Sequence, residues 1–205
     1  MPFKAPFFER EELWRRADEF RSTHWDGRLP VEVLAIAEFK LGLEIRPIKN
    51  LKKDCDAEAS LLSDLKTLVL DSDSYMDDRY QNRLRFSVAH ELGHLALHHD
   101  FVAAANITSV EAWLAYYRDI PEKEYGFIEY HANEFAGRLL VPHGDLTREL
   151  ASAKAQGVKG GLPLKLLNSD QGREYLASAI HRPFGVSAEV VSRRIGRETD
   201  LWPFK

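Results

Sequence analysis

The residues of this chain best suited to chemistry are two histidines and a glutamate, His90, Glu91 and His94, in the order H-E-x-x-H. Their segment has helical periodicity, and four residues at 3.6 per turn bring His90 and His94 to nearly the same face. Zinc accepts imidazole and carboxylate ligands, and a catalytic zinc takes three protein groups and a water. Glu91 lies beside the open coordination position and is the natural base for that water. The pattern predicts a zinc hydrolase centre. The alternative is a surface helix in which the H-E-x-x-H motif occurs by chance.

A third zinc ligand is expected from a second helix, at residues 122–140. Glu129 and Asn133 are four residues apart in this helix and share a face. Glu129 is the predicted ligand. Asn133, one turn away, could hydrogen-bond a histidine ligand and fix its ring. His131 and Glu134 are alternatives for the ligand role, but they point to other sides of the helix.

His98 lies another four residues beyond His94 and therefore on a similar face. Two roles are open for it. It could support a metal ligand from behind. It could also cap the C-terminal end of its helix, where the helix dipole favours a partly charged imidazole.

The elements before these helices give the expected fold class. Helices are expected at 8–20 and 30–41 from the spacing of apolar residues. Three short strands, at 43–48, 57–62 and 66–71, predict a small, mostly antiparallel sheet. The polar runs 50–56 and 71–74 are expected to be loops. With the helix at 78–98, this pattern predicts an α+β fold in which several helices pack against a three-stranded sheet.

The rest of the chain is expected to be helical. The predicted helices here are short, at residues 110–117, 146–155, 171–181 and 188–195. We expect residues 1–205 to form a single domain, with a peripheral N-terminal helix within 1–29 and a helical C-terminal part at 143–205. The last two helices are joined through glycine and could form a DNA-binding helix-turn-helix, with basic charge from Arg193, Arg194 and Arg197. Because Glu189, Glu198 and Asp200 dilute that charge, no direct binding to nucleic acid is expected.

The composition of the chain bears on its cellular compartment and on its possible partners. The formal net charge is -4, which gives no overall electrostatic case for nucleic acid. Cys55 is the single cysteine, so no internal disulfide can form and a reducing compartment is favoured. The start of the sequence does not look like a secretory signal, and no run approaches the roughly 20 apolar residues of a membrane span. A cytoplasmic protein without membrane contact is expected.

Several segments together resemble the ImmA/IrrE family of zinc metallopeptidases, which is gluzincin-like and has an HExxH motif. Residues 85–94, RFSVAHELGH, with Leu97-His98 after them, are similar to the family's first motif. Residues 129–136, EYHANEFA, running into LLVP at 139–142, resemble its second motif. Residues 184–187, FGVS, with Arg194-Ile195, resemble a late segment. The resemblance covers roughly residues 30–196.

This resemblance implies a zincin-type α+β domain with zinc ligands His90, His94 and Glu129 and with Glu91 as base. It also implies a separately encoded partner, a helix-turn-helix repressor that is cleaved or inactivated in a stress, prophage or toxin–antitoxin type of regulation. The alternative is a zinc-bearing regulatory or antitoxin-like protein that binds its partner without cleaving it. For peptide hydrolysis, a further donor to the oxyanion is needed, with candidates Tyr116, Tyr117, Tyr125, His143 and His181.

Overall fold

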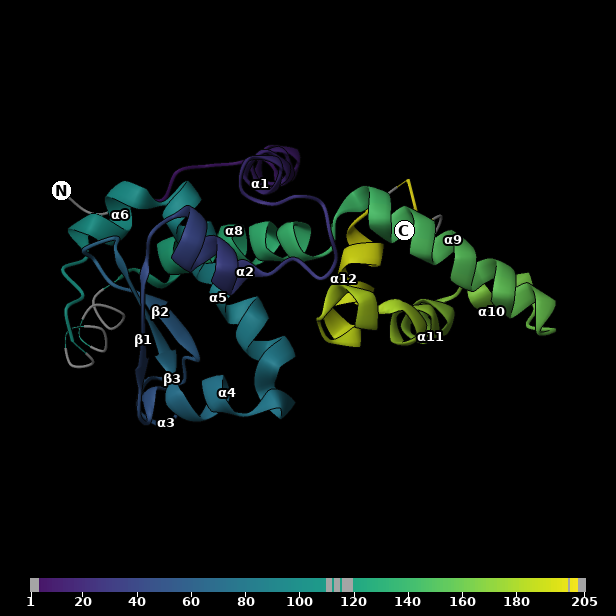
Figure 1. Ribbon diagram of the computed structural model, residues 1–205. Helices are drawn as coiled ribbons and strands as arrows, with labels where there is room; N and C mark the ends of the chain where they lie inside the picture. The colour runs from purple at the N-terminus through teal and green to yellow at the C-terminus, as the bar shows by residue number, and fades with distance from the viewer. Residues whose placement is uncertain (1–3, 110–111, 113–114, 116–119, 199, 203–205) are drawn as a thin grey trace.

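A small β-sheet, two long crossing helices and a C-terminal helical group build this protein (Figure 1). The computed structural model describes residues 4–109, 112, 115, 120–198 and 200–202. The sheet lies at one end of the molecule and the C-terminal helices extend away from it at the other (Figure 1). The α+β fold class predicted from the sequence is confirmed.

The sheet is mixed, so the prediction of a mostly antiparallel sheet was wrong in this detail. Its strands are β1 (Glu44–Ile48), β2 (Ala59–Leu61) and β3 (Thr67–Asp71), in the order β1-β3-β2. The β2–β3 pair is antiparallel, but β1 pairs with β3 in parallel, with Glu44 opposite Thr67. Short sequence distances suggested hairpins throughout, whereas parallel neighbours need a longer crossover.

The connection from β1 to β3 consists of a short helix and strand β2. The polar run expected as a loop contains α3 (Leu51–Cys55), which follows β1, and β2 then returns the chain in the opposite direction before β3. Leu51 and Cys55 are buried and pack with Val69 on one face of the sheet. Leu68 and Leu70, which alternate with Val69 along β3, belong to the main core on the other face. The central strand is therefore buried on both sides.

The two helices that carry the predicted ligands are α5 (Gln81–Leu97) and α8 (Glu122–Leu140). Helix α5 buries Leu84, Val88 and Leu92, with the spacing of one helical face, and packs between β2 and α8. Helix α1 (Arg10–His24) packs along α8. The sheet edge, α5 and α8 thus form consecutive layers.

Shorter elements complete the N-terminal half. They are α2 (Val33–Ala35), the π-helical turn η1 (Ile36–Lys40), α4 (Ser72–Met76), η2 (Asp78–Tyr80) and α6 (His99–Ala104). Helix α4 lies where a polar loop was expected. The Asp71 side chain accepts a hydrogen bond from Ser74 N at 2.9 Å and so caps it. The helix predicted at 110–117, with its aromatic residues, falls largely outside the described residues.

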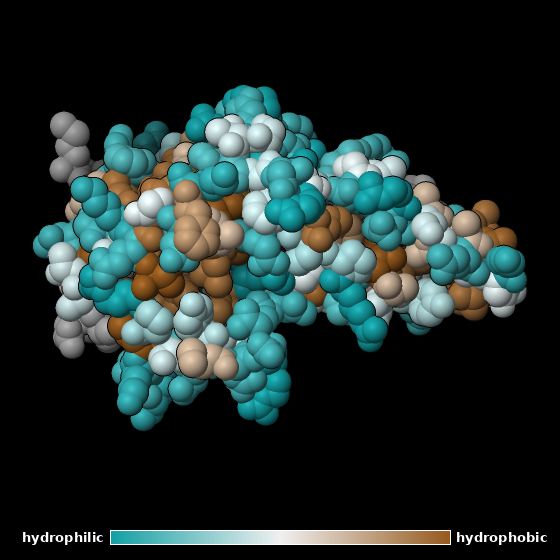
Figure 2. All heavy atoms as spheres, viewed as in Figure 1, coloured by the Kyte–Doolittle hydropathy of each residue, from teal (hydrophilic) through white to brown (hydrophobic). Residues whose placement is uncertain are grey.

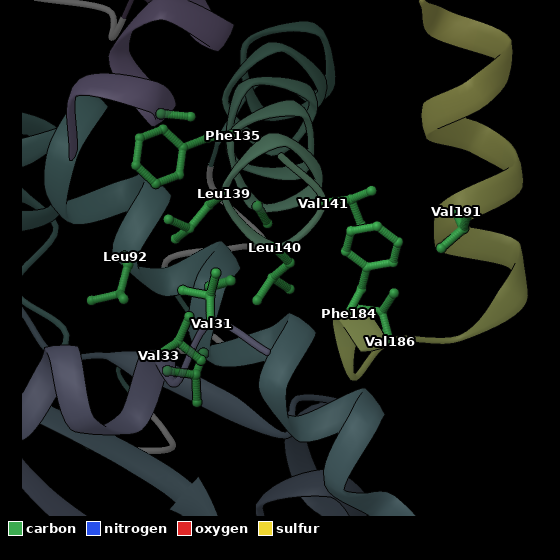
Figure 3. Packing of buried hydrophobic residues seen from close by; sticks show 14 of the residues in the cluster. Val31, Val33, Leu92, Phe135, Leu139, Leu140, Val141, Phe184, Val186 and Val191 are labelled. Carbon is green, nitrogen blue, oxygen red and sulfur yellow. The ribbon is translucent and has the colours of Figure 1, made fainter. Parts of the chain in front are cut away.

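The C-terminal group consists of α9 (His143–Lys159), α10 (Leu164–Leu167), α11 (Asp170–Ile180), η3 (Arg182–Phe184) and α12 (Ala188–Arg197). Its core is continuous with that of the first half. In Figure 3, Phe135, Leu139 and Leu140 extend from α8 toward Leu92, Val31 and Val33, while Val141 faces Phe184, Val186 and Val191. The assignment of residues 1–205 to a single domain stays a prediction.

The surface is mostly hydrophilic in the view of Figure 2. Hydrophobic surface appears over the sheet-bearing half and at the tip formed by α9 and α10. At that tip, Val158, Leu164 and Leu166 are exposed. None of the described helices is both long and apolar enough to span a bilayer.

Candidate metal centre

Three predicted ligands converge where α5 crosses α8. His90 Nε2 and His94 Nε2 lie 3.0 Å apart. The Glu129 carboxylate from α8 places Oε2 3.3 Å from His90 Nε2 and Oε1 3.4 Å from His94 Nε2. Two helices far apart in the sequence thereby present two nitrogens and a carboxylate to one point.

These separations fit a tetrahedral metal ion. Zinc binds nitrogen and oxygen at about 2.0–2.1 Å, so two ligand atoms in a tetrahedral site lie about 3.3 Å apart. The three edges of 3.0, 3.3 and 3.4 Å between His90, His94 and Glu129 are close to that value. The side chains are half-buried to buried, with exposed fractions of 14%, 8% and 25%. The donor set therefore fits zinc and leaves one side open.

The close helix crossing depends on Gly93. A Cβ at this position would lie 3.2 Å from Ala132 Cα and 3.3 Å from Ala132 O, both backbone atoms of α8. The absence of a side chain at this position therefore lets α8 pack close to α5. Without that approach, Glu129 could not reach the two histidines.

Each histidine has a partner behind its ring. Asn133 Oδ1 lies 3.3 Å from His90 Nδ1, and His98 Nδ1 lies 3.1 Å from His94 Nδ1. His98 Nε2 in turn lies 3.2 Å from His131 Nδ1 on α8. His98 is the C-cap residue of α5, and its buried ring also contacts His94 and His131, so the structure is compatible with both roles that the sequence left open.

This chain of rings has one consistent set of tautomers when Nε2 of each ligand faces the metal. His90 Nδ1–H then donates to Asn133, and His94 Nδ1–H donates to His98 Nδ1. His98 Nε2–H donates to His131 Nδ1. Burial, together with the neighbouring His94 and His131, lowers the pKa of His98 to about 2, so this ring stays neutral and can accept the hydrogen bond.

The electrostatics of Glu129 and His90 suit a bound cation. Burial alone would raise the pKa of Glu129, but hydrogen bonds with His90 and His94 hold it well below its ordinary value. Burial opposes charge on His90, but Glu129 and the charge of Glu91 outweigh it and raise the His90 pKa. The carboxylate therefore remains ionised, and positive charge is favoured at this point.

Glu91 lies at the open side of the cluster. One of its carboxylate oxygens and the ligand atoms of His90 and His94 all lie within 4.8 Å of one another. Its Oε2 accepts a hydrogen bond from Leu61 N of the edge strand β2 at 2.8 Å. Burial raises the Glu91 pKa above its usual value, partly offset by His94 and His90. A carboxylate with a raised pKa is a better proton acceptor.

A small cavity opens beside this carboxylate. Its lining includes Leu61, Glu91, His94, Tyr125 and Glu129. Burial, with the charges of Glu129 and Glu91, raises the pKa of Tyr125 to about 12, so this phenol keeps its proton at neutral pH.

Of the other candidate hydrogen-bond donors to the oxyanion, two have partners away from the metal centre and two lie outside the described residues. His143 contacts Glu198 and Asp200, and His181 contacts the Val186 carbonyl at 2.8 Å. Tyr116 and Tyr117 lie outside the residues that the structure describes.

The alternatives for the third ligand have different neighbours. Glu134 accepts a hydrogen bond from Trp14 Nε1 at 3.1 Å and contacts Arg197 Nε at 3.3 Å. His131 faces His98, as described above. Sequence reasoning missed the contacts of Glu91 with Leu61 and of His98 with His131. The buried position of His131 one helix away left no signal in the spacing of the motifs.

A HExxH helix between a sheet edge and a second, glutamate-bearing helix defines a zincin-like metallopeptidase domain. Residues 75–196 match the peptidase family described as the IrrE N-terminal-like domain. The match covers more than half of the chain, and the chain belongs to this family. The resemblance to the ImmA/IrrE family is thereby confirmed.

A solved structure shares the fold. The chain is similar to a "Mycobacterium tuberculosis transcriptional regulator", with a TM-score of 0.51 and 17% sequence identity. The similarity covers 92% of this chain and 48% of the other, so this chain spans about half the length of that regulator. Comparison with curated proteins finds no match.

Proposed function

We propose that this protein is a zinc-dependent endopeptidase that cleaves, and so inactivates, a helix-turn-helix repressor. The observation that carries the proposal is the convergence of His90, His94 and Glu129 beside the Glu91 carboxylate. Membership of a metal-dependent peptidase family supports it.

The ligand set would be His90, His94 and Glu129, with His98 and Asn133 fixing the two rings. When bound there, zinc supplies a Lewis acid that polarises a carbonyl and lowers the pKa of a water. The raised pKa of Glu91 suits this residue to take a proton from water and pass it to the leaving nitrogen. Because Leu61 N–H holds Oε2, the other oxygen, Oε1, is the one available for proton transfer.

Two further groups of the chain would orient the substrate. β2 lies at the edge of the sheet, and Leu61 within it contacts Glu91, so an extended peptide pairing with this edge would pass the base. Tyr125 lines the cavity beside Glu91 and Glu129 and retains its proton. We assign Tyr125 the role of hydrogen-bond donor to the oxyanion.

The repressor as substrate rests on the family resemblance and on the type of protein that shares the fold, a transcriptional regulator. A cytoplasmic setting is part of this proposal, because a repressor of transcription is found there. The net charge of -4 and the acids Glu189, Glu198 and Asp200 beside the C-terminal arginines argue against direct nucleic acid binding. The same neighbour favours a second function, a zinc-bearing regulator that binds its partner without cleaving it. The two functions differ in whether Glu91 is needed.

The test is therefore Glu91→Gln. Glutamine has nearly the same shape and can still accept the hydrogen bond of Leu61 N–H, but it cannot take the water proton. We expect zinc content and partner binding to remain and hydrolysis to fall by about 10²- to 10⁴-fold. Mass spectrometry of a repressor encoded beside this chain, after incubation with parent or variant, measures the cleavage.

Parent protein stripped of metal by a chelator and then reloaded with zinc is the control for the assay. If zinc-loaded Glu91→Gln cuts or inactivates the repressor at the parental rate, the peptidase proposal is wrong. Inactivation without any cut product would favour the binding function.

A further inference from the structure

Behind His94, a row of histidine rings leads from the metal centre to helix α8. His94 Nδ1 lies 3.1 Å from His98 Nδ1, and His98 Nε2 lies 3.2 Å from His131 Nδ1. The exposed fractions of these three residues are 6%, 3% and 1%. His131 follows Glu129 by two positions on α8, and its ring contacts His98. The row therefore links α5 to α8 at a second place, apart from the Glu129 carboxylate.

Each contact in this row has a direction. A neutral imidazole carries one N–H donor and one bare nitrogen that accepts. Burial disfavours a charged ring, so His98 and His131 are neutral. His98 therefore donates with one nitrogen and accepts with the other. The hydrogen bond that it makes to one neighbour determines the one that it makes to the other.

Only one of the two possible directions suits a metal ligand. If His94 Nδ1–H donates to His98, the opposite nitrogen of His94, Nε2, keeps a lone pair for the metal. His98 must then donate through Nε2–H, and His131 Nδ1 accepts. In the reverse direction, His98 Nδ1–H donates to His94 Nδ1, and the proton of His94 stays on Nε2, where it blocks the metal. Metal binding therefore needs an acceptor at the far end of the row.

The other histidine ligand needs no such row. His90 Nδ1 lies 3.3 Å from Asn133 Oδ1, an amide oxygen that only accepts. The partner of His94 is instead a ring nitrogen, which donates or accepts according to its tautomer. The state of His94 thus depends on a residue one step further away, whereas that of His90 does not.

The surroundings of His131 hold its ring and keep bulk water away. Phe8, from the chain before α1, meets this ring edge to face, with ring centroids 5.2 Å apart and an interplanar angle of 67°. Because His131 and His98 are both buried, bulk water does not replace the acceptor if His131 is lost. The His98 N–H would then be buried without a partner, which is costly.

We propose that His131 is a positioning residue of the metal centre: its Nδ1 accepts the hydrogen bond of His98 Nε2–H and thereby presents the bare Nε2 of His94 to the metal. This inference rests on the proposed zinc site, and it gives His131 a role other than that of third ligand. Zinc affinity should follow the hydrogen-bonding capacity of the side chain at position 131 and not its shape.

Asparagine and leucine at position 131 separate these two properties, because their side chains have nearly the same shape. His131→Asn keeps an acceptor oxygen near the place of Nδ1, whereas His131→Leu removes the acceptor. We expect His131→Leu to weaken zinc affinity by about 10-fold, the lower end of the range for groups behind a ligand, and His131→Asn to stay near the parent. Competition with a zinc chelator gives both affinities.

His181→Leu is the matched control, because His181 Nδ1 contacts the Val186 carbonyl at 2.8 Å, away from the metal centre. This variant loses a histidine and its hydrogen bond in the same way, and it should bind zinc as the parent does. A loss of affinity as large as that of His131→Leu would contradict the proposal.

NMR of the imidazole nitrogens adds a measurement that a packing role would not affect. In the zinc-loaded parent we expect His94 to be protonated on Nδ1 and His98 on Nε2. A proton on His98 Nδ1 would overturn the proposal, and so would equal affinities in the asparagine and leucine variants of His131. Neither measurement uses hydrolysis, so failure of the peptidase function would appear in the cleavage test of Glu91→Gln and not here.

Discussion

Two clusters of histidine and acidic side chains lie close enough to share a metal ion in the part of the chain that the structure describes. One is His90, Glu91 and His94, and the other is His143, Glu198 and Asp200. Both combine histidine with carboxylate side chains, and in each the potential ligand atoms lie within 4.8 Å of one another. Their surroundings differ, and this difference decides which can hold a cation.

In the first cluster the ligand nitrogens face one point and the other ring nitrogens contact polar partners, Asn133 and His98. In the second, His143 directs Nδ1 at Glu198 and Nε2 at Asp200, at 3.3 and 3.4 Å. Glu198 also receives Arg138 Nη1 at 2.7 Å and contacts Arg194. Two guanidinium groups already neutralise this carboxylate, so a metal ion would meet repulsion there.

Proximity of potential ligands is therefore a weak indicator of a metal site. Charge balance and the orientation of each ring are stronger ones. Substitutions at the ligands, at their ring partners and at the helix crossing alter these features separately, with expected effects that decrease in that order.

The largest expected effect separates the two clusters directly. His94→Ala removes a nitrogen that faces both His90 and Glu129, and it should abolish most zinc binding. His143→Ala is the matched change in the other cluster and should leave zinc content at the parental value. Metal analysis of both purified variants measures this. Parental zinc in His94→Ala would remove the basis of the proposed site.

A smaller effect is expected from the ring partners. Asn133→Ala leaves His90 Nδ1 without its acceptor and should weaken zinc affinity by about 10- to 100-fold, less than Glu129→Ala does. Asn133→Asp keeps an oxygen acceptor and is the control, with affinity near that of the parent. Competition with a zinc chelator gives the three affinities. Equal affinity in Asn133→Ala and parent would show that this contact does not support the ligand.

The smallest effect concerns the helix crossing. Gly93→Ala gains about 1 kcal/mol of helix propensity but pushes a methyl against the α8 backbone, at a typical overpacking cost of about 1–3 kcal/mol. We expect a net loss of unfolding free energy and weaker zinc binding. Gly126→Ala, on α8 with nothing within 4 Å of its Cβ, should instead be neutral or stabilising. Urea unfolding of the metal-free proteins measures both, and a stabilising Gly93→Ala would contradict the account.

The sequence was informative where spacing encodes geometry. The i, i+4 spacing of His90 and His94, and of Glu129 and Asn133, is sufficient to place each pair on one helical face. The strands were also located closely: residues 43–48 alternate apolar and polar, and β3 contains the apolar run Leu68-Val69-Leu70. Long periodic helices such as α5 and α8 carry the strongest signal of this kind.

The sequence was less informative where contacts join distant segments. The parallel pairing of β1 with β3 requires β2 to return the chain, and the connection from β1 to β2 contains α3, a helix too short to show a period. The contact of His98 with His131 depends on how α5 and α8 cross. A groove lined by residues of α5, α8 and α12 likewise brings together side chains that are far apart in the sequence.

The most direct test is a crystal of the zinc-loaded protein measured at the zinc absorption edge. We expect one strong anomalous peak per chain, within bonding distance of His90 Nε2, His94 Nε2 and the Glu129 carboxylate. A peak at His143, Glu198 and Asp200 instead, or no peak at the crossing of α5 and α8, would contradict it.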